Sequence, residues 1–349
     1  MARKTEILKP KPSDTNRLAM YWLYHDERIT LPWSSAKFLQ DWSGKTLDIA
    51  GFLKTYNFGY FEFGRYVQEN KRINMFYSTV EGCTILSSEL FFNSANLGMD
   101  KEVSVAYGAR GQGGKALAFY DPYSGFINLT RDSGVGSFAH EYAHALDYIL
   151  GSRYDTLKGS MYLTDGGETP LRHIVTAILD EVLKQFNEHN TKEEPIKYDE
   201  KEYWYRKKEV FARSFEAWVS RATKGLQKDG YPYKADLLVR SSRYNNSQIY
   251  PSKFEGRLDD LFSAFCILAG EAMNGKSLTE LKKKSTTNIT KKQTTMIRAT
   301  KKTKRTTTRK RTTTTKRKTT RKTTKRTTTK RKTTATKKTT TRKKNSCKR

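Results

Sequence analysis

The spacing of apolar residues predicts four helices. Over residues 70–96, 171–187, 202–221 and 254–273, apolar side chains recur every three or four positions, the period of one face of an α-helix. A helix with one apolar face needs another element to cover that face. We therefore expect these helices to pack their apolar faces into a core.

A shorter period marks the middle of the chain. Apolar and polar residues alternate over residues 103–107 and 126–130, and residues 116–120 are mostly apolar, as expected for strands. A glycine-rich turn, residues 108–114, separates the first strand from the next. We interpret this region as a β-hairpin. Residues 58–64 also alternate, but their two glycines weaken the case for a strand there.

The next segment carries the clearest chemistry, the sequence His140-Glu141-Tyr142-Ala143-His144. It lies in a predicted helix, residues 138–150, which we expect to end at Gly151. The pattern H-E-x-x-H is typical of zinc metallopeptidases, because residues four apart lie on one helix face and can bind one ion. His140 and His144 are therefore predicted zinc ligands. Glu141 is the predicted general base that accepts a proton from zinc-activated water.

A catalytic zinc site needs a third protein ligand. The remaining histidines do not continue the motif, because Asp147 stands where a longer histidine motif has glycine. We expect a carboxylate on a later helix instead. Glu209 is the preferred candidate, since the small residue Ala212 would let that helix approach the metal helix closely. Glu216 is the alternative, either as the ligand or as the acceptor that orients a ligand imidazole.

Three further residues have open roles. Asp147 lies on the same helix face as the two histidines, so it either orients an imidazole or is simply a carboxylate near the helix end. Tyr203 precedes Glu209 by six residues. Tyr205 precedes Glu209 by four. One of the two tyrosines, with Tyr203 preferred, is a candidate catalytic residue that donates a hydrogen bond to the oxyanion of a tetrahedral intermediate; otherwise both are ordinary aromatic residues.

Two resemblances meet at these residues. The segment from His140 to Asp147, taken with Glu209-Val-Phe-Ala-Arg-Ser-Phe, resembles the zinc site of anthrax-toxin lethal factor-like zincins. That resemblance implies Glu209 as the third ligand. The longer stretch 58–151 resembles the large polyvalent protein associated domain of phage and conjugative-element proteins. Its matching segments are Phe58–Gly64, Ala116–Tyr120, Ile127–Thr130 and Gly136–Asp147.

These resemblances imply an α+β, zincin-like metallopeptidase domain that mobile elements carry into host cells. The chain departs from the usual motif at Ala143, where such sequences commonly have glycine. Alanine is well tolerated in a helix, so the departure concerns only close packing at that position.

The charge of the chain is confined to its C-terminal part. From Lys276 onward there are 31 lysines and arginines but only one acidic residue, Glu280, which accounts for the whole formal net charge of +30. After residue 285 the segment consists mainly of Thr, Lys and Arg and has no aromatic residue. Such a composition does not provide a core, so we expect disorder. We predict a flexible lead-in, 1–16, a zincin-like domain, 17–275, and a cationic tail, 276–349.

The composition limits the cellular locations that we expect for the protein. No apolar run is long enough to span a membrane, and no signal peptide is visible, so we expect a location in the host cytoplasm or in a virion. Three widely spaced cysteines fit a reducing compartment. We expect a zinc metalloendopeptidase acting on a protein or peptide, with a tail that binds nucleic acid without sequence preference. The alternative is a histone-like or virion-packaged nucleic-acid-binding protein whose zincin domain is only a scaffold.

Overall fold

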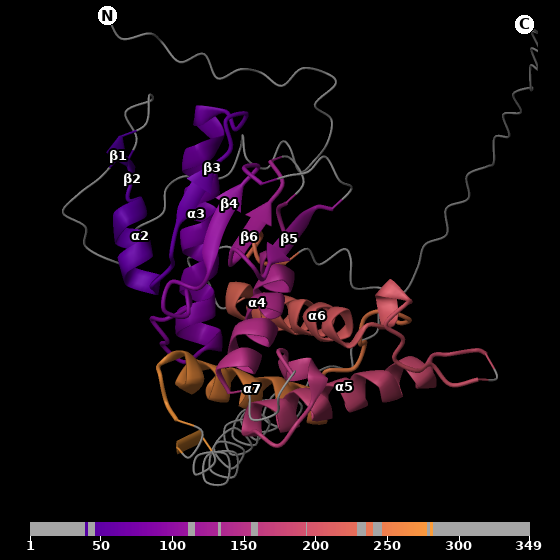
Figure 1. Ribbon diagram of the computed structural model, residues 1–349. Coiled ribbons are helices and arrows are strands. Elements are labelled where there is room, and N and C mark those ends of the chain that lie inside the picture. Colours follow the sequence, from indigo (N-terminus) through magenta and orange to yellow (C-terminus); the bar gives the residue numbers. More distant parts are fainter. Residues whose placement is uncertain are drawn as a thin grey trace, which may run out of the picture. The chain divides into compact units, whose positions relative to one another are not determined.

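The computed structural model forms an α+β arrangement with six α-helices and two sheets among the residues it describes (Figure 1). The described residues are 39–40, 46–110, 116–131, 134–154, 160–192, 194–228, 235–239, 246–277 and 280–281. The predicted lead-in and nearly all of the predicted tail lie outside these ranges, as does His25.

A four-stranded sheet has the order β3 (Phe61–Phe63), β4 (Ser104–Tyr107), β6 (Phe126–Leu129) and β5 (Ala118–Asp121). The predicted hairpin is confirmed for β5 and β6, which pair antiparallel. However, β4 pairs with β6 in parallel and has no ladder with β5, and β3 pairs in parallel with β4. The antiparallel strand β5 therefore lies at one edge of the sheet. A separate two-stranded sheet joins β1 (Leu39–Gln40) and β2 (Thr46–Leu47).

Aromatic side chains join β3 and β4 to α2 (Ile49–Tyr56) and α3 (Glu69–Ile85). The ring of Phe61 on β3 lies 5.4 Å from that of Phe52 and 5.6 Å from that of Phe76, in edge-to-face geometry. All three side chains are buried, and each contributes roughly 1.5–3 kcal/mol through burial. The hydroxyls of Tyr107 and Thr79 are 2.6 Å apart, which satisfies both polar groups inside this core.

The helix predicted over 70–96 is shorter than expected. After α3 the chain continues as a π-helical turn, η1 (Leu86–Leu90), and then leaves the helix. Phe92 and Asn93 adopt left-handed backbone conformations, with φ of 54° and 64°, which a right-handed helix does not allow.

The helices that follow the sheet build the second half of the core. Helix α4 (Phe138–Arg153) contacts β5 and β6 and packs along α6 (Lys207–Lys228), while α5 (Pro170–Glu188) packs along α7 (Arg257–Met273). Figure 1 shows α4 and α6 between the sheet and the α5–α7 pair. The prediction of a helix over 202–221 is wrong at its start, because a 3₁₀ turn, η3 (Tyr203–Tyr205), and an extended Arg206 precede α6.

The predicted end of the motif helix at Gly151 is also wrong, since α4 continues to Arg153. Gly151 serves close packing instead. A β-carbon at this position would lie 2.6 Å from the backbone nitrogen of Leu163, in the short helix η2 (Leu163–Asp165), and 2.7 Å from the carbonyl oxygen of Met161. Glycine therefore allows the chain after α4 to pass directly over the helix.

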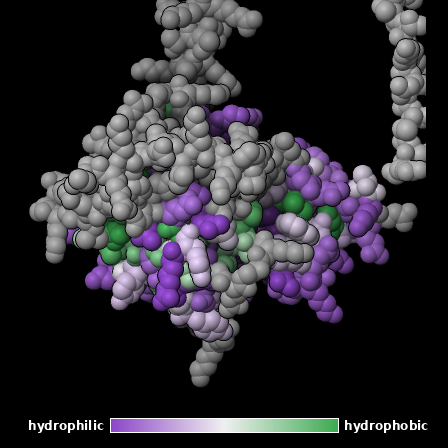
Figure 2. Space-filling view, turned by 90° about the horizontal axis from the view of Figure 1, so that it is seen from above, coloured by the Kyte–Doolittle hydropathy of each residue, from purple (hydrophilic) through white to green (hydrophobic). Residues whose placement is uncertain are grey.

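The core extends slightly beyond the predicted domain boundary. Leu281, in the segment that we assign to the tail, is fully buried within the main hydrophobic cluster. Figure 2 shows hydrophilic residues over most of the coloured surface on the face it views, with apolar residues in small separate areas. Within the described ranges, none of the helices has both the length and the apolar character that crossing a bilayer requires.

Candidate metal centre

Helix α4 presents His140 and His144 side by side toward α6. Their Nε2 atoms are 3.2 Å apart, and their side chains are only 15% and 19% exposed. This follows from the helical repeat, which places residues i and i+4 on one face. The pair is therefore preorganised on a rigid element, as the sequence pattern predicts.

Glu209, in the first turn of α6, points at the same position. Its Oε2 atom lies 3.5 Å from His140 Nε2, and its Oε1 atom lies 3.5 Å from His144 Nε2. Helices α4 and α6 pack along each other, and the small residues Ala143 and Ala212 are fully buried. The structure thus brings the three predicted ligands together, with one donor atom from each lying within 4.8 Å of the others.

The donor set fits zinc. Two imidazole nitrogens and one carboxylate oxygen form a ligand combination common in catalytic zinc sites. In the part of the chain that the structure describes, the buried Oε2 atom of Glu209 has no hydrogen-bond partner. Its nearest charged neighbours are His140 Nε2 at 3.5 Å and Arg213 Nη1 at 3.7 Å. A buried carboxylate oxygen that accepts no hydrogen bond is costly, and a cation bound directly to it would satisfy it. The zinc ion itself remains a prediction.

Glu216 lies behind His140 rather than among the converging donor atoms. Its Oε2 atom is 3.4 Å from His140 Nδ1, and its side chain is 1% exposed. A carboxylate at Nδ1 favours the tautomer that leaves Nε2 free to bind a metal. Of the two carboxylates considered from the sequence, Glu209 lies among the converging donor atoms and Glu216 lies at the opposite nitrogen of His140.

Burial and neighbouring charges shift the pKa values of the two histidines and of Glu209. Burial lowers the pKa of His140, but interactions with Glu209 and Glu216 outweigh this effect and raise the pKa to about 10. Burial and the neighbouring charge of His140 lower the pKa of His144 to about 3. Burial raises the pKa of Glu209, but the two histidines and Tyr203 together lower it to about 2. The carboxylate of Glu209 is therefore ionised at neutral pH.

Glu141 lies beside the histidines on the side facing β5. Its side chain is buried, and burial raises its pKa to about 7 while the charge of His140 opposes the rise. The backbone N–H of Tyr120 also donates a hydrogen bond to this carboxylate and lowers the pKa. A carboxyl group with a pKa near neutrality can both accept and return a proton.

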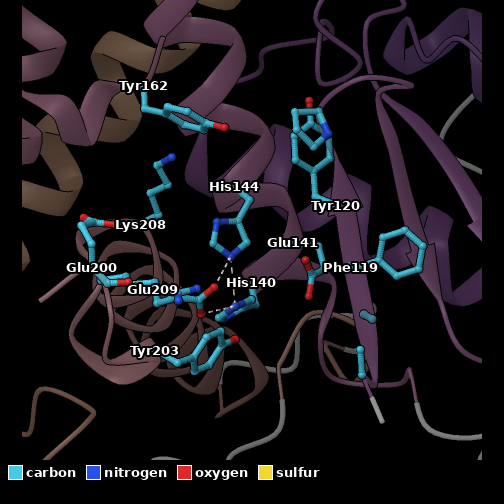
Figure 3. Close-up of a pocket in the computed structure, with 14 residues that line it drawn as sticks. Phe119, Tyr120, His140, Glu141, His144, Tyr162, Glu200, Tyr203, Lys208 and Glu209 are labelled. Carbon is cyan, nitrogen blue, oxygen red and sulfur yellow. Dashed lines mark hydrogen bonds and ion pairs between the residues drawn. The ribbon is translucent and has the colours of Figure 1, made fainter. Parts of the chain in front are cut away.

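These residues line a cleft of about 450 Å³ between β5, α4 and the start of α6 (Figure 3). Tyr203, in η3, lies at its margin and is about half exposed. Burial raises the pKa of Tyr203, and its hydroxyl also interacts with Glu209. The structure therefore places this predicted catalytic residue beside the ligand set, although on a turn and not on the helix that we expected.

The edge strand β5 borders the cleft with backbone groups that do not pair with β6, among them the Tyr120 N–H that donates to Glu141. Thr130 N donates to Leu117 O, and hydrogen-bonded pairs alternate along an antiparallel ladder. The backbone groups of Phe119 and Asp121 therefore face β6, whereas those of Ala118 and Tyr120 face the free edge. The edge presents backbone donors and acceptors directly beside Glu141.

Asp147 does not orient an imidazole. Its two carboxylate oxygens accept hydrogen bonds from Thr164, one from the backbone N–H at 2.8 Å and one from Oγ1 at 2.9 Å. These two hydrogen bonds join α4 to η2. Of the histidines outside the motif, His173 is exposed, and His189 is also exposed and lies 3.1 Å from Ser252 Oγ.

Some residues of the site carry no sequence signal of their own. Arg213, one turn after Glu209, is 2% exposed, and its Nη1 atom lies 3.7 Å from Glu209 Oε2. Its guanidinium also donates hydrogen bonds to the carbonyl oxygens of Trp204 and Ile249. The bond to Trp204 joins η3 to α6. In the sequence, the spacing of four residues from Glu209 is the only feature that places Arg213 on the same helix face.

One comparison with known proteins gives a match. Residues 196–269 match the family model of large polyvalent protein-associated domain 1. This segment contains Glu209 and Glu216 but not the H-E-x-x-H helix, so the support for this kind of domain falls on a different part of the chain from the stretch 58–151. No curated protein and no solved structure matches the chain.

Proposed function

We propose that this chain is a zinc metalloendopeptidase of phage or mobile-element origin, built on a zincin-like fold. The observation that carries the proposal is the convergence of His140, His144 and Glu209 at the floor of a cleft, with Glu141 beside them. This combination pairs a zinc-type donor set with a carboxyl group whose pKa lies near neutrality.

Each side chain has a role in the proposed reaction. Zinc held by His140, His144 and Glu209 would supply Lewis acidity to polarise a peptide carbonyl and acidify water. Glu141 accepts the proton of the attacking water and passes it to the departing amine. Glu216 keeps His140 oriented through Nδ1.

Substrate binding falls to two elements. An extended peptide would pair with the outward backbone groups of Ala118 and with the carbonyl oxygen of Tyr120 on β5, as in β-strand addition. This pairing would set the scissile bond next to Glu141. Tyr203 then donates a hydrogen bond to the carbonyl oxygen as negative charge develops on it.

The domain match supports the proposed origin. A domain described as large polyvalent protein-associated fits a protein encoded by a phage or another mobile element. The peptidase activity rests on the site geometry and not on this match.

The test is cleavage of a fluorogenic peptide library by zinc-reconstituted protein. Glu141→Gln preserves the shape of the side chain and removes the base, so we expect it to retain zinc and to lose about 10²-fold or more in cleavage rate. Tyr203→Phe removes one donor to the oxyanion and should cost about 10²-fold in kcat. Equal cleavage by the wild type and Glu141→Gln would contradict the proposal.

A second function is favoured by the charge of residues 276–349. This segment carries the entire net charge of +30, so we propose that it binds DNA or RNA through phosphate contacts. Binding should be independent of sequence and should fall steeply with salt. If the zincin-like domain is only a scaffold, this binding is the main function of the protein.

Salt titrations on duplex DNA test the proposed role of the tail. A chain truncated after residue 284 should lose tight binding, because residues 1–284 keep only +3 of the formal net charge of +30. Equal, weak binding by the full-length and truncated chains would rule the role out.

A further inference from the structure

Two cationic side chains line the cleft next to the candidate metal residues. Lys208 Nζ lies 3.3 Å from the centre of the Tyr162 ring, and the guanidinium of Arg206 lies 5.9 Å from that of Tyr203. Both side chains are partly buried. Within the ranges that the structure describes, neither takes part in an ion pair. Neither the ammonium of Lys208 nor the guanidinium of Arg206 is therefore held in a direct contact by a carboxylate of the cleft.

The acidic groups nearby are engaged elsewhere or lie at the margin. Glu209 contacts both histidines, and Glu141 accepts a hydrogen bond from β5. Asp147 is buried and accepts hydrogen bonds from Thr164; burial raises its pKa and the charge of Lys208 lowers it, but the two groups form no ion-pair contact. Glu200 lines the cleft but is exposed to solvent. No carboxylate that remains in the cleft holds the ammonium of Lys208.

We propose that the Lys208 end of the cleft is a subsite for an acidic side chain, Asp or Glu, of the substrate peptide. The inference deepens the proposed peptidase function and rests on it. Figure 3 shows Lys208 extending toward Tyr162 on the His144 side of the site, across from Tyr120. A substrate carboxylate there would meet the ammonium of Lys208. The phenolic hydroxyls of Tyr162 and Tyr120, which line the same cleft, are further hydrogen-bond donors.

The surroundings of Lys208 favour recognition by charge. Its ammonium lies over an aromatic face and is partly removed from water, so an ion pair there is stronger than on an open surface. The same charge disfavours a substrate lysine or arginine, which supplies discrimination as well as attraction. Arg206, which also lines the cleft, adds a second positive charge.

Lys207 provides a matched control for this subsite. It is the neighbouring residue on the same helix, but its Nζ atom lies 5.8 Å from the centre of the Tyr198 ring, and it does not line the cleft. Lys207→Glu and Lys208→Glu change the net charge of the protein by the same amount. Any difference between them therefore reports on position and not on overall charge.

The first arm of the test uses cleavage. Zinc-reconstituted protein is given positional-scanning peptide libraries in which Glu, Gln or Lys is fixed at each position in turn. We expect one position at which Glu is preferred over Lys by about tenfold or more, a preference that Lys208→Glu abolishes or reverses and Lys207→Glu retains. Absence of such a position, or equal losses in both variants, would overturn the subsite.

The second arm does not depend on catalysis. Glu141→Gln protein is titrated with fluorescein-labelled peptide pools fixed as Glu or Lys, and binding is followed by anisotropy. The Glu pool should bind about tenfold more tightly, and only Lys208→Glu should remove the difference. If no peptide is cleaved but this difference persists, the peptidase proposal fails and the acidic subsite stands. If the two pools bind equally, the subsite is contradicted even in an active enzyme.

Discussion

Glu216 lies 3.4 Å from the Nδ1 atom of His140, on the side of the imidazole opposite to the converging donor atoms. On the same helix, α6, Glu209 lies 3.5 Å from Nε2, the other ring nitrogen of His140. The two carboxylates therefore approach this predicted zinc ligand at opposite nitrogens. The two carboxylates are seven residues apart on the same helix face. A single helix thus supplies both a predicted ligand and the group that orients its partner.

This arrangement predicts unequal effects on zinc affinity. Glu216→Ala should weaken binding by about 10–100-fold, the usual cost of losing a group that orients a ligand. Glu209→Ala should weaken binding much more, because only Glu209 would bond the ion. Competition with a chelator of known affinity measures both, with Glu255→Ala as a surface control, since that side chain is 89% exposed. The reverse order would make Glu216 the ligand.

Zinc binding should release protons. The pKa of His140 is about 10 in the metal-free protein, so its imidazole is protonated at pH 8, whereas His144 and Glu209 are already deprotonated. Zinc must displace this proton, so apparent affinity should rise about tenfold per pH unit between pH 7 and 9. Calorimetry in two buffers with different ionisation enthalpies gives the proton count. An affinity that does not change with pH would show that His140 is neutral before zinc binds.

Asp147 should matter for stability and not for metal. Asp147→Ala leaves the buried N–H and hydroxyl of Thr164 without their acceptors, which should cost about 1–3 kcal/mol in unfolding free energy. Asp147→Asn keeps one acceptor and should cost less. Neither change should alter zinc affinity in chelator competition, because the carboxylate contacts no imidazole. A marked loss of zinc affinity in Asp147→Asn would restore the orienting role.

Gly151 is predicted to be required for packing. Gly151→Ala places a methyl group against the backbone of residues 161–163, and should lower the unfolding free energy by about 1–3 kcal/mol despite the better helix propensity of alanine. Gly225 in α6 is the control, because a β-carbon there meets nothing within 4 Å. Gly225→Ala should instead stabilise by roughly 0.5–1 kcal/mol. Urea unfolding of both variants decides, and a stable Gly151→Ala protein would contradict the close contact.

The parts of the site that sequence could predict are those fixed by the helical repeat. His140 and His144 are four residues apart, so any helix through them brings them together. Glu209 required more, since its place depends on how α4 and α6 pack. The small residue Ala212, one turn after Glu209, was the local indication of this contact.

Long-range contacts explain what the sequence could not predict. The parallel pairing of β3, β4 and β6 joins strands separated by long connections, and no local pattern specifies it. The partner of Asp147 lies 17 residues away on η2. Gly151 carries the usual signal of a helix end, yet its role depends on a later segment that crosses the helix. The left-handed conformation of Phe92, which ends the helical run after η1, is uncommon for a bulky residue and has no sequence signal.

The most direct test of the account is the zinc content of the full-length chain after reconstitution and removal of loose metal. The account predicts one tightly bound zinc per chain in the wild type and in Glu141→Gln, which keeps all three ligands. It predicts essentially none in the His140→Ala, His144→Ala double variant, because a carboxylate alone holds the ion poorly. Full zinc occupancy in the double variant, or none in the wild type, would contradict the central claim that α4 and α6 together form a zinc site.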